Sequence, residues 1–454
     1  MAQINNRNSS FLELGTQKTG KLLTKYSIPA IIAMTASAIY HITDSIFIGQ
    51  GAGPMAISGL AITFPVMNLA AAFGSLVGAG GAAIMSLRLG QQNYAAAKKI
   101  LGNVLLLNIT LGLLFSIITL IFLDPILLFF GASKQTLPYA RDFMHIILIG
   151  NVITHLYLGL NAMLRSLGSP IKAMIATIIT VAINLILNPL FIFGLGLGIK
   201  GSALATVIAQ TIVFIWQVIL FLNKKNEIRI EKQIFKFNWN IVRDIFSIGM
   251  APFLMNLASC VIVIIINKGL VKQGGDMAVG AYGIINRVTF LFVLIVFGFN
   301  QGMQPIAGYN YGAKLFKRVN EVLKKTIIYA TIVMTTGFAL IELFPGFIAG
   351  FFTSDTEMIS FTIVGMRLAS MFFPIIGFQM VASTFFQSIG MAKKAIFLSL
   401  ARQVIFLIPC LLVLPNFIGI NGIWLSLPIS DFASTILTAI LLIIQLRKLK
   451  TLNV

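Results

Sequence analysis

Long apolar runs fill most of this chain, and they restrict what it can fold into. A helix needs roughly 20 apolar residues to cross the hydrocarbon core of a bilayer. The sequence contains about twelve blocks of that length, near residues 25–48, 57–86, 101–123, 142–165, 172–194, 201–222, 242–267, 279–305, 326–349, 360–387, 395–415 and 422–445. Only 10% of the 454 residues are charged, whereas about a quarter are charged in a soluble domain. We therefore expect an all-α integral membrane protein with twelve transmembrane helices.

The formal net charge is +20, with 33 basic and 13 acidic residues, and its distribution argues against nucleic-acid binding. With the N-terminus placed inside, the inside segments carry 25 of the Lys and Arg residues and the outside loops carry 5. Cytoplasmic loops of membrane proteins are enriched in Lys and Arg, so this asymmetry predicts that both termini are cytoplasmic. The basic residues would then face anionic membrane lipids.

The two halves of the chain are similar to each other. Four pairs of positions match at separations of 223, 222, 222 and 221 residues: Pro29 with Pro252, Gly90 with Gly312, LRSLGSPIKA at 164–173 with FQSIGMAKKA at 386–395, and Gly201 with Gly422. Such a near-constant separation indicates an internal repeat. Six spans in each half would give both halves the same direction across the membrane, which is the arrangement of parallel repeats in alternating-access transporters.

The polar segments divide the chain into two pseudo-symmetric lobes of six helices each. The predicted parts are a cytoplasmic N-terminal segment 1–24, an N-lobe 25–222 with spans one to six, a cytoplasmic linker 223–241, a C-lobe 242–445 with spans seven to twelve, and a cytoplasmic tail 446–454.

No motif in the sequence indicates catalysis or nucleotide binding. GTQKTGKL at 15–22 has the spacing of a phosphate-binding loop, but Leu22 replaces the Ser or Thr that would hold magnesium. GLGIKG at 196–201 lies between two apolar spans and has no βαβ unit around it. No catalytic Ser/His/Asp set and no His/Cys metal cluster is evident. We expect no enzyme activity, no cofactor and no nucleotide or nucleic-acid partner.

Polar side chains gather at a similar depth in three spans of the N-terminal half. Tyr40 and Asp44 are one turn apart in span one, and Asn184 and Asn188 are one turn apart in span five. Thr206 lies a few residues into span six, about 8 Å along a helix. Oxygen-rich side chains around one carboxylate suit a proton or a small cation such as Na⁺, and we predict no other metal site.

A structural role is the alternative for some of these residues. Polar side chains often hydrogen-bond neighbouring helices together in membrane bundles, and this interpretation stays open for the Asn and Thr residues. Asp44 differs, because a carboxylate within a span is costly and typically marks function.

The second half carries different polar residues. A C-lobe polar cluster is predicted from Asn256, Arg287, Arg367, Arg402 and Asp431. Each arginine could instead extend its side chain to the nearest membrane interface. Asp431 is deeper in its span, so we expect it to pair with an arginine.

These residues and several longer stretches resemble the multidrug and toxic compound extrusion (MATE) transporters, in the DinF-like branch. The matching stretches are LLTKYSIPAII, TDSIFIG, NPLFIFGLGLGIKGSALAT and QPIAGYNYGA. The resemblance implies two six-helix lobes around a central cleft, and export driven by inward flow of H⁺ or Na⁺. In that branch an N-lobe site contains two acids, and its positions correspond to Tyr40, Asp44, Asn184, Asn188 and Thr206.

One position departs from the family pattern. Asn188 stands where the second acid of the site is usual, so the site would hold one carboxylate instead of two. Affinity for a hard cation depends on ligand charge, so the change should weaken Na⁺ binding. We therefore favour H⁺ as the coupling ion and keep Na⁺ at Asp44 as the alternative.

The resulting prediction is a cation-coupled antiporter that exports drugs and other amphipathic organic compounds by alternating access and so confers antibiotic resistance. We expect a multi-pass monomer in the bacterial cytoplasmic (inner) membrane, in contact with membrane lipids. Because the C-lobe carries arginines, anionic or zwitterionic cargo stays an alternative to cationic cargo. A flippase for a lipid-linked precursor, as in the wider superfamily, is the alternative function.

Overall fold

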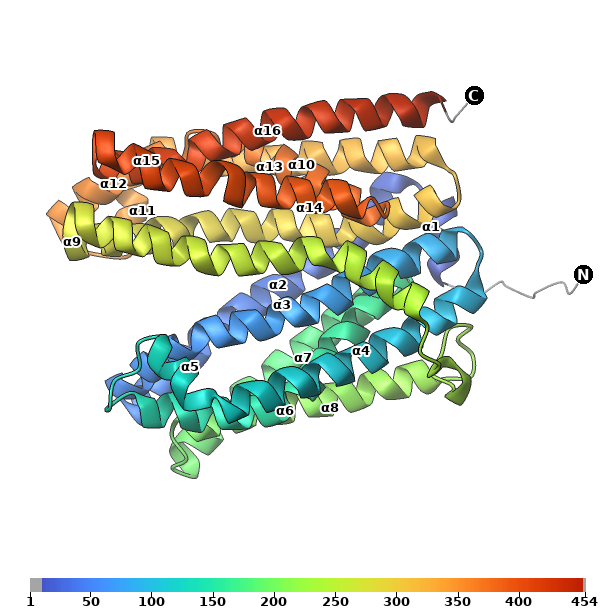
Figure 1. Ribbon diagram of the computed structural model, residues 1–454, viewed down its shortest axis with the longest axis horizontal. Helices are drawn as coiled ribbons and strands as arrows, with labels where there is room; N and C mark the ends of the chain where they lie inside the picture. Colours follow the sequence, from blue (N-terminus) through green and yellow to red (C-terminus); the bar gives the residue numbers. More distant parts are fainter. Residues whose placement is uncertain (1–9, 452–454) are drawn as a thin grey trace, which may run out of the picture. The chain divides into compact units, whose positions relative to one another are not determined.

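A computed structural model describes residues 10–451, and every regular element among them is a helix (Figure 1). The first nine and last three residues, which belong to the predicted N-terminal segment and C-terminal tail, lie outside the described residues. The elements are η1 (Ser10–Leu12), α1 (Glu13–Thr16), α2 (Thr19–Ala52), α3 (Pro54–Gly90), α4 (Tyr94–Ile121), α5 (Leu123–Phe129), α6 (Leu137–Ser166), α7 (Pro170–Pro189), η2 (Leu190–Gly194), α8 (Ile199–Leu222), η3 (Lys232–Ile234), α9 (Trp239–Gly312), α10 (Phe316–Leu343), α11 (Pro345–Gly350), α12 (Thr356–Ser370), α13 (Phe373–Ser388), α14 (Ala392–Leu400), η4 (Ala401–Leu407), α15 (Ile408–Ile418) and α16 (Ile420–Thr451).

The helices are long and apolar enough to cross a bilayer. Among the described residues ten helices meet this condition, or eleven if the bent pair α12 and α13 counts as one span. Helix α9 counts once, although its 74 residues would reach about 110 Å as a straight helix. Gly275 interrupts it with a non-helical backbone (φ 62°, ψ −155°), and Figure 1 shows the chain turning back there. The all-α membrane fold is confirmed, and the count of twelve spans stays a prediction.

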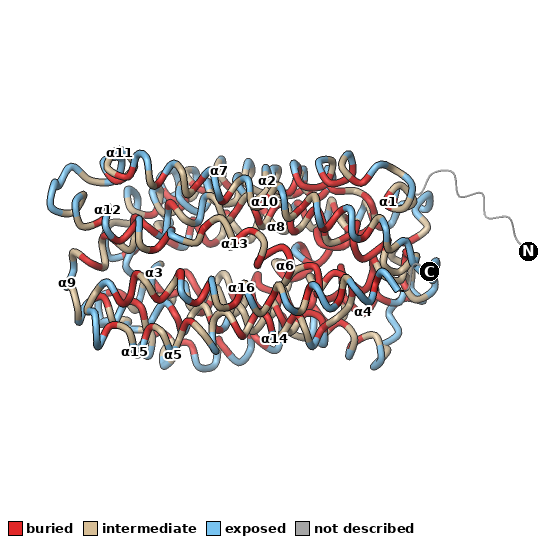
Figure 2. The backbone as a smooth tube through the Cα atoms, turned by 90° about the horizontal axis from the view of Figure 1, so that it is seen from above, coloured by how far each residue is buried: buried red, intermediate tan, exposed pale blue. Residues whose placement is uncertain are grey.

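Many large apolar side chains lie on the surface of these helices. Buried and exposed stretches alternate along single helices in Figure 2, and exposed residues include Ile149, Phe347 and Phe417. A soluble protein seldom exposes so many large apolar side chains. These side chains would face lipid in a bilayer.

The described chain forms two compact units. Unit 1 contains Ile32–Phe253 and the described residues up to Gln17, and unit 2 contains Lys18–Ile31 and the described residues from Leu254 onward. One of the three boundaries lies between α1 and α2, and the other two fall inside a helix, in α2 shortly after Pro29 and in α9 shortly after Pro252. The two prolines are the first matched pair of the internal repeat. In each half, the first long helix (α2 or α9) therefore contributes residues to both units.

Glycines allow close helix packing inside each unit. In unit 1 a Cβ on Gly80 would lie 2.2 Å from the carbonyl oxygen of Ile245, and one on Gly249 would lie 1.8 Å from that of Leu76. In unit 2 a Cβ on Gly377 would lie 2.7 Å from the carbonyl oxygen of Ala330. Small residues let the backbones of membrane helices approach each other in this way.

Candidate functional site

Asp44 lies on α2 in unit 1 and is only 7% exposed. Its Oδ1 atom accepts a hydrogen bond from the Ser202 hydroxyl on α8. The same oxygen accepts one from Asn188 Nδ2 on α7 at 2.5 Å. Asp44 forms no ion pair with Lys or Arg among the described residues; two neutral donors bond its Oδ1 atom, and His41 lies one turn earlier on the same helix.

A chain of hydrogen bonds continues from Asp44 to Tyr40. Asn188 Nδ2 also approaches Asn184 Oδ1, at 3.4 Å. Asn184 Nδ2 donates to the Thr206 hydroxyl at 3.1 Å, and the Thr206 and Tyr40 hydroxyls lie 2.8 Å apart. The structure thus brings all five residues predicted for the N-lobe site into one network over three helices.

Local packing explains why the three helices meet here. A Cβ on Gly51 of α2 would lie 2.1 Å from the side chain of Ile192 in the π-helical turn η2, which follows α7. A Cβ on Gly201 of α8 would lie 2.8 Å from the backbone of Phe191. Two glycines therefore let α2 and α8 close on the end of α7, which places Asp44 beside Asn188 and Ser202.

Ser202 was not predicted from the sequence. It lies one turn before Thr206 on α8, so spacing on that face was the available signal. A polar residue at this spacing is common in membrane helices, and the spacing alone does not show which of the two hydroxyls reaches the carboxylate.

The site offers several oxygen atoms to a cation. The Asp44 carboxylate, the two Asn carbonyls and the hydroxyls of Ser202 and Thr206 are hard ligands of the kind that Na⁺ accepts. However, Asn188 turns its nitrogen toward Asp44, and its Oδ1 atom is buried without a hydrogen-bond partner among the described residues. In this orientation the amide nitrogen of Asn188, and not its oxygen, faces the carboxylate.

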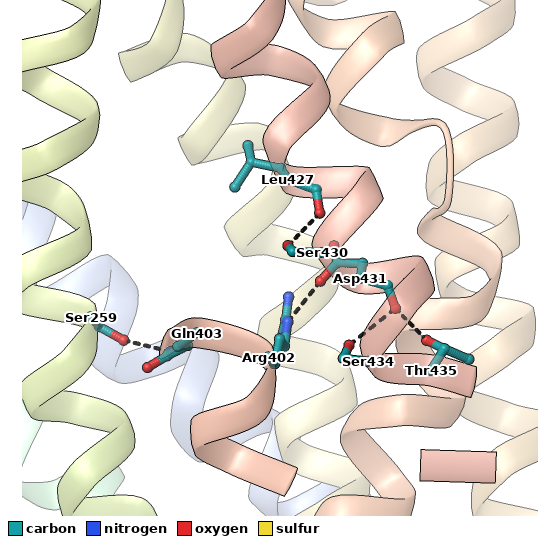
Figure 3. Close-up of polar contacts among 8 residues, drawn as sticks. All are labelled: Ser259, Arg402, Gln403, Leu427, Ser430, Asp431, Ser434 and Thr435. Atoms are coloured by element: carbon teal, nitrogen blue, oxygen red, sulfur yellow. Dashed lines mark hydrogen bonds and ion pairs between the residues drawn. The ribbon is translucent and has the colours of Figure 1, made fainter. Parts of the chain in front are cut away.

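The predicted C-lobe residues do not form a single cluster. Arg402 of η4 pairs with Asp431 of α16, with Nε donating to Oδ1 at 2.7 Å (Figure 3). This contact is the arginine pairing predicted for Asp431. Arg367 pairs instead with Glu342 at 3.5 Å, near the ends of α12 and α10, and Arg287 is exposed on α9. Asn256 is half-buried on α9.

Together the fold and the site define a class: a multi-pass helical membrane protein with polar networks inside its spans, as transporters have. The MatE family model matches residues 29–190 and, separately, residues 247–412. The chain therefore belongs to the MATE family of membrane transporters. One match falls in each half of the chain, in agreement with the internal repeat. Family membership also confirms that the chain is no enzyme, while the DinF-like branch stays a prediction.

Individual relatives agree with the family. The chain is 28% identical over 435 residues to the multidrug export protein MepA of Staphylococcus haemolyticus (strain JCSC1435), covering 95% of each chain. It is also 28% identical over 436 residues to MepA of Staphylococcus aureus (strain NCTC 8325 / PS 47), again covering 95% of each.

Solved structures show the same fold. A crystal structure of MATE in complex with MaL6 superposes with a TM-score of 0.92 at 23% identity, covering 98% of this chain and 100% of that one. An outward-facing multidrug resistance MATE family transporter of the MOP superfamily gives 0.90 at 23% identity, covering 97% and 98%.

Proposed function

We propose that the chain is a proton-coupled antiporter that exports amphipathic organic compounds, with Asp44 as the residue that carries the proton. The observation that supports this most is a buried carboxylate that is held by Ser202 and Asn188 and that pairs with no Lys or Arg among the described residues. Burial raises the free energy of a charged carboxylate relative to its protonated form, so burial favours proton uptake. Gly51 of α2 and Gly201 of α8 allow these helices to pack closely around Asp44.

Proton uptake would change which hydrogen bonds fit around Asp44. In the charged form two donors converge on Oδ1. A protonated carboxyl group must itself donate, so it needs an acceptor nearby. The Asn188 Oδ1 atom, which has no partner among the described residues, becomes that acceptor if the amide group rotates.

This rotation links the proton to helix packing. Turning the Asn188 amide moves its nitrogen away from Asp44 and alters its contact with Asn184. Because Asn184 bonds Thr206, and Thr206 bonds Tyr40, the change reaches α8 and returns to α2. Two protonation states would thus favour two packings of the same helices, which a coupled transporter requires.

The proposed cargo rests on the relatives. The two MepA proteins are named multidrug export proteins, which favours drug export over the flipping of a lipid-linked precursor. We propose a monomer in a bacterial cytoplasmic membrane. Its basic residues gather on the predicted inner loops, which supports a topology with both termini inside.

The choice between H⁺ and Na⁺ can be tested directly. Purified protein in proteoliposomes should export a cationic dye on a pH gradient and respond little to a Na⁺ gradient at matched pH. Asn188→Asp adds a second carboxylate beside Asp44, so this variant should gain Na⁺ dependence. Asn151→Asp is the matched control, since Asn151 of α6 bonds the carbonyl oxygen of Gly112 and lies outside the network, so this variant should gain no Na⁺ dependence. Export by wild type on a Na⁺ gradient alone would contradict the proton as coupling ion.

A further inference from the structure

Five basic residues gather at one end of unit 2, where α14 begins and α16 ends. They are Lys393 and Lys394 in the first turn of α14, and Arg447, Lys448 and Lys450 in the last turns of α16. None of the five forms an ion pair with an acidic residue in the part of the chain that the structure describes. The predicted topology places this end of the unit at the cytoplasmic side of the membrane.

Lys394 has a defined position between three helices. Its Nζ atom donates a hydrogen bond to Gln445 Oε1 on α16 at 2.7 Å, and it lies 5.3 Å from the centre of the Phe386 ring on α13. Both partners are buried, so packing fixes them, whereas Lys394 is half-buried. An ammonium group has three N–H donors, and Gln445 accepts from one of them. The other donors of Lys394 are able to bind an anion.

A second lysine lies beside this ammonium group. Lys448 follows Gln445 by three residues on α16, so the two share a helix face, and the charge of Lys448 acts on Lys394. Two positive charges in one place repel each other. An anion that binds both ammonium groups removes this repulsion, which favours its binding.

The two lysines lie where the apolar surface of α16 ends. Ile440, Ile443 and Ile444 are 52%, 51% and 44% exposed, and the basic residues follow within one turn. The isoleucines would face the acyl chains of a bilayer, which places the lysines at the level of the lipid head groups. Basic pockets between membrane helices on the cytoplasmic side bind anionic head groups. The chemistry of this end of unit 2 therefore fits a lipid.

The internal repeat does not carry this arrangement in both halves. Lys172 stands at the position that matches Lys394, but Leu164 stands at the position that matches Phe386. The fold shared by the two halves thus does not require the contact of an ammonium group with a ring. The first half supplies a lysine at the same place in the fold as a control.

We propose that Lys394 and Lys448 form a binding site for the phosphate group of an anionic membrane lipid in the cytoplasmic leaflet. The phosphate oxygens accept hydrogen bonds from both ammonium groups, and lysine binds phosphate as a point charge. The acyl chains lie along the exposed isoleucines of α16. The other three basic residues add attraction to the anionic membrane surface.

Native mass spectrometry of the purified full-length protein counts bound lipids and tests the site. Phosphatidylglycerol and phosphatidylcholine with the same acyl chains are compared, because only the first has a net negative charge. Wild type should bind phosphatidylglycerol more tightly. Lys394→Gln combined with Lys448→Gln should weaken phosphatidylglycerol binding by about thirtyfold, since each lysine near an anionic lipid contributes about fivefold. Binding of phosphatidylcholine should not change.

Two controls separate this site from the general positive charge. Lys172→Gln combined with Lys225→Gln removes the same charge from the predicted inner side of unit 1 and should leave the affinity unchanged. Lys448→Arg keeps the charge at an exposed position and should keep the affinity, whereas Lys448→Gln should lower it about fivefold. The two single variants decide the question if the double variant fails to fold.

Four results would overturn the lipid site. They are equal affinity of wild type for the two lipids, equal loss in the two double variants, equal affinity of the two Lys448 variants, and displacement of phosphatidylglycerol by inorganic phosphate at the same concentration. The last result would indicate a site for a free anion. No transport is measured here, so the proposed antiporter is tested separately.

Discussion

At the scale of single residues, Asp44 differs from the other acids of the chain that the structure describes. Asp124, Asp244 and Glu321 form ion pairs with Arg or Lys, and each of these pairs is at least one-third exposed. Asp44 is buried and is held only by a hydroxyl and an amide. Because it pairs with no Lys or Arg among the described residues, protonation of Asp44 breaks no ion pair there.

Ser202 is the first residue whose role can be tested. Ser202→Ala removes one of the two donors to the charged carboxylate, so Asp44 should hold its proton more tightly. We expect the midpoint of the pH dependence of transport to move upward by about one pH unit, because a hydrogen bond to a charged group stabilises it by about 1.5 kcal/mol.

The matched control is Ser45→Ala. The Ser45 hydroxyl bonds the carbonyl oxygen of His41 within α2, next to Asp44 in sequence but outside its network. Its pH profile should coincide with that of wild type. Equal profiles for both serine variants would show that Ser202 does not act on the carboxylate.

At the scale of helices, the close contact of α3 with the first part of α9 should matter most for stability in unit 1. A Cβ on Gly249 meets the backbone of Leu76, which cannot move as a flexible side chain could. Gly249→Ala should therefore lower the thermal stability of the purified protein by about 1–3 kcal/mol, the usual cost of overpacking.

Gly283 of the same helix provides the control. A Cβ there would meet no atom within 4 Å. Gly283→Ala should leave the melting temperature unchanged or raise it, since Ala favours a helix by up to about 1 kcal/mol over Gly. A melting temperature that is unchanged in the Gly249 variant would contradict the packing described for α3 and α9.

The helices also show what the sequence could and could not predict. Apolar runs predicted where spans lie, because lipid and the core both accept apolar side chains. They did not predict the ends of helices: α2 begins at Thr19 and not near residue 25, since a helix can continue into a polar segment. The short helix α5, which follows the predicted span 101–123, was missed. Helix α11 lies at the end of the predicted span 326–349, where the sequence did not show that a separate helix begins.

The candidate site, like the helices, could be predicted only in part from the sequence. A separation of four residues predicted that Tyr40 shares a helix face with Asp44, and Asn184 with Asn188, because residues one turn apart lie on the same face. Spacing cannot show the depth at which separate helices meet, so Ser202 was missed. For the same reason the sequence predicted that Asp431 pairs with an arginine but not that its partner is Arg402.

At the scale of the whole molecule, the charge distribution predicts the orientation in the membrane. Single cysteines in a background of Cys260→Ser and Cys410→Ser can report it. The two positions chosen are exposed. Lys225 belongs to the predicted cytoplasmic linker, and Met55 lies just before span two, on its predicted outer side. A membrane-impermeant reagent should label Met55→Cys in intact cells, and Lys225→Cys only after the membrane is opened. The opposite pattern at either position would reverse the orientation.

The central claim is that one carboxylate, Asp44, exchanges its proton as cargo binds and leaves. The most direct measurement is proton release when a cationic dye is added to purified protein in weakly buffered solution. Linkage predicts that wild type releases up to about one proton for each dye molecule bound. Asp44→Asn should bind the dye and release none. Equal proton release by this variant would show that another group carries the proton, and it would contradict the mechanism.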